Sequence, residues 1–99
     1  MKTDLSIRAC IYLRAAELVE QGHCKYVLWE RNDAGEKVAF CYRGALIEAE
    51  AEITGLCDDS WKLLAWRAPE KLVDWNNRPS TTKEMVAAKL REQAFEEGV

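Results

Sequence analysis

One histidine and several cysteines are the residues of this chain best suited to metal chemistry. His23 and Cys24 are adjacent, and Cys41 and Cys57 follow at wide intervals. Imidazole nitrogens and thiolate sulfurs are the ligands that zinc prefers. Structural zinc sites usually draw ligands in close pairs, because one tight turn then presents two sulfurs. No such pair occurs here, so we favour thiols without a metal and expect neither a metal nor a cofactor.

Cys41 also raises the question of nucleophilic catalysis. It stands just before a predicted helix, and the N-terminus of a helix lowers the pKa of a thiol. His23 could serve as its base, because the two ends of a hairpin are neighbours. The sequence places no carboxylate or amide to orient that histidine, and it indicates no oxyanion site. A weak thiol enzyme is therefore our third hypothesis, and we expect a protein that is not an enzyme.

The favoured role of Cys41 is to pack the hairpin onto the helix that follows, which Gly44 and Ala45 allow to approach closely. In that role, Cys41→Ser should destabilise the protein more than Cys41→Ala, because serine buries a hydroxyl group.

Tryptophan is the one residue type in excess, with four in 99 residues. Trp61 and Trp66 are five positions apart on a predicted helix, so they do not share one narrow stripe. Exposed tryptophan near arginine is typical of binding hot spots. Core packing explains the same aromatics more simply, because small domains need them inside. The candidate binding residues are Trp61, Trp66, Trp75, Asn76, Arg78, Tyr42 and Arg43.

Charge and hydropathy narrow the classes of partner. The net charge is -3, and acidic and basic residues are interspersed along the chain. A basic face that could neutralise phosphates is not indicated, so we expect no nucleic acid partner. No apolar stretch has the 18 or so residues that a membrane span requires, so we expect no membrane association.

The beginning of the sequence and its cysteines indicate a compartment. Asp4 and Arg8 interrupt the apolar core that a secretory signal needs, which predicts a cytoplasmic protein. Thiols stay reduced there, and free cysteine is among the most buried residue types. We therefore expect four reduced thiols in the core.

The first element is a predicted helix over residues 3–21. Thr3 or Asp4 can cap its start, and Gly22 stands where a left-handed cap is expected. One apolar face recurs at helical spacing, with Cys10 at its border, where burial accounts for it. The residues of that face are Ile7, Ile11, Ala15 and Leu18.

Residues 25–31 and 37–41 are predicted to form a β-hairpin around a turn that contains Asp33 and Gly35. If the turn centres on Ala34, Leu28 faces Phe40 and Val27 faces Cys41. Cys24 and Cys41 are then not opposite each other, so this register does not favour a disulfide between them.

Helical patterns fill the rest of the chain. One helix runs over residues 44–52 and ends at Gly55, with Glu48, Glu50 and Glu52 on a solvated face. Others are predicted over residues 58–68 and, starting at Pro69, to residue 75. The last helix begins at a capping box formed by Thr81 and Glu84 and carries an apolar stripe of Val86, Leu90 and Ala94.

These elements predict an α+β fold: a mainly helical single domain over residues 1–99, with an N-terminal helix, one β-hairpin and then three or four helices.

The order of these features resembles a family of small bacterial and phage proteins that is known only as a domain of unknown function. Family members often have an aromatic residue before the first cysteine of the pattern, where this chain has His23. The resemblance implies the fold and adds no activity. The residues that carry it are Gly22, Cys24, Asp33, Gly35, Cys41, Gly44, Ala45, Leu46, Trp75, Asn76 and Thr81 or Thr82.

The leading functional hypothesis is a non-catalytic cytoplasmic binding or regulatory protein that acts through a protein partner. Phage and accessory genes in the family would fit interference with a host protein. The alternative is a pocket protein for a small ligand, such as a nucleotide, lined by tryptophan, Tyr42, Arg43 and Asn76. A concave pocket with aromatic walls would favour the ligand, and a flat apolar patch would favour the protein partner.

Overall fold

The computed structural model describes residues 3–55 and 70–97. Within these residues, four helices and one two-stranded antiparallel hairpin form a mainly helical α+β fold, which confirms the predicted class. The helix predicted over residues 58–68 and its neighbour Pro69 lie outside the described residues. In chain order the elements are α1 (Thr3–Gln21), β1 (Trp29–Arg31), β2 (Lys37–Phe40), α2 (Tyr42–Thr54), α3 (Glu70–Asn76) and α4 (Lys83–Glu96).

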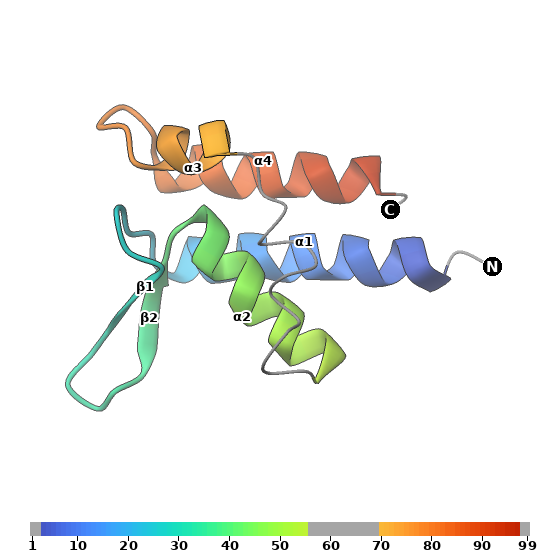
Figure 1. Ribbon diagram of the computed structural model, residues 1–99, viewed down its shortest axis with the longest axis horizontal. Helices are drawn as coiled ribbons and strands as arrows, with labels where there is room; N and C mark the ends of the chain where they lie inside the picture. The colour runs from blue at the N-terminus through green and yellow to red at the C-terminus, as the bar shows by residue number, and fades with distance from the viewer. Residues whose placement is uncertain (1–2, 56–69, 98–99) are drawn as a thin grey trace.

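Helix α1 is the centre of the fold. It contacts α4, α2 and β2, and α1 and α4 run antiparallel along the length of the molecule (Figure 1). The predicted apolar stripe of α4 is fully buried, and so are the described members of the predicted face of α1. Alanines at the contacts let the helices approach closely. The core residues that these two helices share are Ile11, Ala15, Ala16, Leu18, Val19, Val86, Ala87 and Leu90.

Helix α2 packs across α1 on the side of the hairpin (Figure 1). It begins two residues before the predicted start and ends at Gly55 as predicted, where a φ of 75° forms a left-handed cap. The prediction of a solvated acidic face is wrong for Glu50, which is 1% exposed. Glu50 follows Leu46 by one helical turn, so it lies on the buried face. Glu52 is exposed and pairs with Arg14 at 2.8 Å.

The hairpin is confirmed, but it is shorter than predicted. Only residues 29–31 and 37–40 are strands, and residues 25–28 form a separate loop. Asn32 organises the turn, because its Oδ1 accepts hydrogen bonds from the N–H groups of Ala34 and Glu36. Gly35 has a φ of 83°, as a turn glycine should.

The predicted register is wrong by one residue at the base of the hairpin. Trp29, rather than Leu28, pairs with Phe40. Arg31 pairs with Lys37 as a turn centred on Ala34 requires, but the register shifts between Glu30 and Arg31. Such a shift is a bulge, which inserts one residue into one strand and displaces every pair beyond it.

At two positions of the hairpin base, the backbone of another segment lies so close that only glycine fits. A Cβ on Gly22 would overlap the carbonyl oxygen of Val38, and a Cβ on Gly44 would overlap that of Leu28. The left-handed cap predicted at Gly22 is wrong, because its φ is not positive. Gly22 instead lets the end of α1 lie against β2, and Gly44 lets α2 lie against residues 25–28.

The cap of the last helix is Thr82, so the capping box predicted at Thr81 is wrong by one residue. The Oγ1 of Thr82 accepts a hydrogen bond from the Met85 N–H at 3.2 Å. Thr81 Oγ1 instead donates to the carbonyl oxygen of Trp75 at 2.5 Å, which ties the end of α3 to the start of α4. Among the described residues, no helix combines the length and apolarity of a membrane span.

Gly44→Ala tests the close approach of α2 to the loop. In an ordinary helix interior this change stabilises by about 1 kcal/mol. Here the added methyl group overlaps backbone, so we expect a loss of about 2–3 kcal/mol in the free energy of unfolding, measured in urea.

Gly55→Ala is the matched control. Nothing lies within 4 Å of its added Cβ, so only its left-handed backbone contributes, at about 1–2 kcal/mol. If Gly44→Ala proved as stable as the parent protein, the close approach would be refuted.

Candidate functional site

Asn76, the last residue of α3, is fully buried and connects three segments. Its Oδ1 accepts hydrogen bonds from the Tyr42 N–H at 3.1 Å and from the His23 ring at 2.8 Å. Its Nδ2 donates to the carbonyl oxygen of Cys24 at 3.2 Å. One side-chain amide therefore holds together the end of α3, the first turn of α2 and the chain that leaves α1.

This arrangement fixes the role of His23. The Tyr42 N–H can only donate, so the atom that it meets on Asn76 is the oxygen. The His23 Nε2 that shares this oxygen must then carry the proton. While this bond lasts, Nε2 cannot accept a proton from a cysteine, so it does not provide the base of a Cys-His pair.

Residues 25–28 form a loop that is tied to the body of the protein at each end. The Tyr26 N–H donates to Asn77 Oδ1 at 2.8 Å, and Lys25 Nζ donates to the carbonyl oxygens of Thr81, at 2.9 Å, and Arg78. At the other end, the Cys41 N–H donates to the Leu28 carbonyl at 3.0 Å. The loop is thus anchored through its backbone and through the Lys25 side chain.

The other three side chains of the loop are exposed. Tyr26 is 77% exposed, Val27 49% and Leu28 41%. Tyr26 also has a φ of 71°, the left-handed conformation that a bulky residue rarely adopts. The Asn77 hydrogen bond holds this unfavourable backbone in place.

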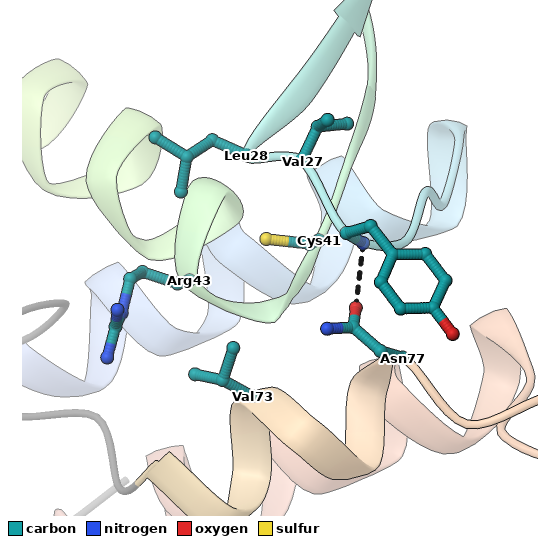
Figure 2. A pocket seen from close by; sticks show the side chains of 7 residues that line it. Val27, Leu28, Cys41, Arg43, Val73 and Asn77 are labelled. Atoms are coloured by element: carbon teal, nitrogen blue, oxygen red, sulfur yellow. Dashed lines mark hydrogen bonds between the residues drawn. The ribbon is translucent and has the colours of Figure 1, made fainter.

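A hollow of about 140 Å³ lies beside the loop (Figure 2). Figure 2 shows the Cys41 thiol pointing into it from the start of α2, with Leu28, Arg43 and Val73 around the sulfur. Pockets for drug-sized ligands usually measure about 300–1,000 Å³. The hollow suits one small group, such as an amino-acid side chain, better than a nucleotide.

Cys41 caps α2 through its sulfur, which accepts a hydrogen bond from the Gly44 N–H at 3.3 Å. Burial raises the pKa of Cys41, although that N–H and the charge of Arg43 act against the rise. Burial likewise raises the pKa of Cys24 to about 11. Both groups are therefore thiols at neutral pH, which is the protonation state of inert buried cysteines.

The expectation of four core thiols is corrected at Cys10, which is exposed. It lies about 100° around the helix from its buried neighbour Ile11, which turns it toward solvent. Cys24 and Cys41 are buried and free, and Cys57 lies outside the described residues. Among residues 3–55 and 70–97, no three His, Cys, Asp or Glu side chains gather as metal ligands.

The candidate binding residues that the structure describes do not form one site. Tyr42 is buried in the core, where its hydroxyl donates to Gln93 at 2.7 Å and burial raises its pKa. Trp75 packs against the core and borders a separate shallow hollow with Met85. Of the candidates that the structure describes, only Arg43 lines the hollow beside the loop.

The other candidate binding residues do not line this hollow or lie outside the described residues. Asn76 is the buried connector, Arg78 contributes a backbone carbonyl, and Trp61 and Trp66 lie outside the described residues.

Sequence reasoning missed Tyr26, Val27, Leu28 and Asn77. It assigned the first three to a strand of the hairpin. Their signal was the consecutive run Tyr-Val-Leu, because a hairpin with one buried face requires alternating apolar and polar residues. Asn77 gave no signal beyond its place at the end of a helix.

Asn76→Ala should destabilise the protein by about 3 kcal/mol, because it leaves the Tyr42 N–H and the Cys24 carbonyl buried without this partner. Asn77→Ala is the matched control and should cost about 1 kcal/mol, since it acts at a less buried position. Urea unfolding of both variants gives the comparison. Equal losses would show that Asn76 does not connect the three segments.

Contrary to the sequence-based expectation, Cys41→Ser should destabilise the protein less than Cys41→Ala. Serine keeps a side-chain acceptor at the cap of α2, whereas alanine removes it at a cost of about 1 kcal/mol. Thermal and urea unfolding measure the order. A serine variant that is less stable than the alanine variant would restore simple packing as the role of Cys41.

Comparison with known proteins supplies a family. A family model described as a family of unknown function, DUF6197, matches residues 6–96. No curated protein and no solved structure matches the chain. The match spans the helices and the hairpin, and it confirms the resemblance to a family of unknown function. The chain belongs to the DUF6197 family.

Proposed function

We propose that this protein is a non-catalytic binding protein that engages a protein partner through residues 25–28. The observation that carries the proposal is Tyr26, an aromatic residue that is largely exposed and held at a positive φ. A backbone conformation of this kind costs about 1–3 kcal/mol and persists where the surrounding structure enforces it, commonly at functional sites. Here the Asn77 side chain enforces it.

The loop has the physical properties of a preformed binding surface. Its backbone is anchored by Asn77 and by the Cys41 N–H, so little conformational entropy is lost when a partner binds. Tyrosine supplies a large contact area through only two rotatable bonds and is enriched among hot spots. Val27 and Leu28 extend the apolar area next to it.

The hollow beside the loop supports the same proposal. Its volume of about 140 Å³ fits one side chain of a partner, and Val27, Leu28 and Val73 offer it apolar walls. The alternative of a nucleotide pocket has less support at this hollow, because its volume is below the usual range and Tyr26 is the one aromatic residue among the described ones that line it.

The chemistry of the buried thiols argues in the same direction. His23 Nε2 is committed to Asn76, and burial keeps Cys41 protonated, so an activated nucleophile has no support here. The free Cys24 and Cys41 support a reducing compartment, and a cytoplasmic location is part of the proposal.

Tyr26→Asn tests the proposal with little disturbance of the loop, because asparagine tolerates a positive φ. Phe95→Asn is the matched control, since Phe95 is 74% exposed and lies near the end of α4, away from residues 25–28. The immobilised proteins are exposed to a lysate of the native host, and captured proteins are quantified by mass spectrometry.

We expect the captured amount of a protein that binds the parent to fall at least tenfold with Tyr26→Asn, as is usual when a hot spot is removed. The captured amount should be unchanged with Phe95→Asn. Thermal melts establish that both variants fold. Capture that persists in Tyr26→Asn, or that falls equally in both variants, contradicts the proposal.

A further inference from the structure

Residues 22–24 lie along the edge of β2 that β1 does not occupy. The Phe40 N–H donates to the Gly22 carbonyl at 2.9 Å, and the Cys24 N–H donates to the Phe40 carbonyl at 3.2 Å. These two bonds form a parallel bridge between His23 and Phe40. Cys24 follows His23 on one segment, and Cys41 follows Phe40 on the other. Because the segments run parallel, the two cysteines are neighbours.

The geometry of such a bridge is compatible with a disulfide. Neighbouring extended segments lie about 4.8 Å apart, and disulfides join Cα atoms separated by about 4.4–6.8 Å. Residues that follow a bridged pair on both segments also point to the same face. Consistent with this, Cys24 and Cys41 share one buried cluster with Ala39.

The structure points to Cys24 and Cys41 as a redox-modification site: we propose that hydrogen peroxide converts them to an intramolecular disulfide. Cys41 reacts first, because its sulfur faces the hollow, which admits a molecule as small as peroxide. The Cys41 sulfur already accepts a hydrogen bond from the Gly44 N–H, and this bond stabilises the attacking thiolate.

The reaction balances in two steps. The Cys41 thiolate attacks peroxide, so a sulfur–oxygen bond forms, the oxygen–oxygen bond breaks and hydroxide leaves. The Cys24 thiolate then attacks the sulfur of the resulting sulfenic acid and displaces a second hydroxide. The two thiol protons neutralise the two hydroxides. Two thiols and one peroxide therefore give one disulfide and two molecules of water.

The disulfide replaces two existing contacts. Cys24 Sγ now donates to the Val27 carbonyl at 3.5 Å, and Cys41 Sγ accepts from Gly44. The covalent bond joins the two chain segments that flank the loop and the hairpin, so it holds residues 25–40 closed. It forms slowly, because burial keeps both thiols protonated at neutral pH. This inference does not depend on the proposed partner.

The experiment treats the full chain with hydrogen peroxide and maps its peptides by mass spectrometry without reduction. We expect a peptide pair that joins Cys24 to Cys41 and is lost on reduction. Cys24→Ser should abolish it, and the pair should form without a bridge to Cys10. In a Cys10→Ser/Cys57→Ser variant, the disulfide should raise Tm by an amount on the order of 10 °C, because it closes a loop of moderate length.

The inference is overturned if bridges join only Cys10 or Cys57, or if the sulfenic acid of Cys41 passes to sulfinic acid without bridging. It is also overturned if Cys24 and Cys41 stay reduced when Cys10 is fully oxidised. The peptide map of the unmodified chain decides these outcomes even where the double variant does not fold.

Discussion

The arrangement of this protein depends on the buried amide of Asn76. Its oxygen receives the Tyr42 N–H at the start of α2, and its nitrogen reaches the Cys24 carbonyl beyond the end of α1. Backbone groups buried without such partners would each cost about 1–3 kcal/mol. Because α3 supplies the amide, the position of this short helix determines whether the base of the hairpin can be buried at all.

Two close contacts of the backbone complete that base. Gly22 brings the end of α1 against β2, and Gly44 brings α2 against the Leu28 carbonyl. Beside this compact base, the side chains of Tyr26, Val27 and Leu28 are exposed.

The exposed loop and the buried thiols are two consequences of one framework. Cys24 precedes the loop and Cys41 receives its far end, through the Leu28 carbonyl. Burial makes both cysteines poor nucleophiles at neutral pH, while their neighbouring positions permit a bond between them. The proposed binding surface and the proposed pair of oxidisable sulfurs thus lie in the same packed region.

Local pattern in the sequence determined the helices that the structure describes, the turn that contains Asp33 and Gly35, and the end of α2 at Gly55, because periodicity and turn chemistry act over a few residues. Tertiary structure alone decided the bulged register of the hairpin, the burial of Glu50, the exposure of Cys10 and the connecting role of Asn76. The neighbouring positions of Cys24 and Cys41 show why local pattern could not decide these features. Hairpin register places them apart, and only the packing of α1 against β2, through Gly22, makes them neighbours.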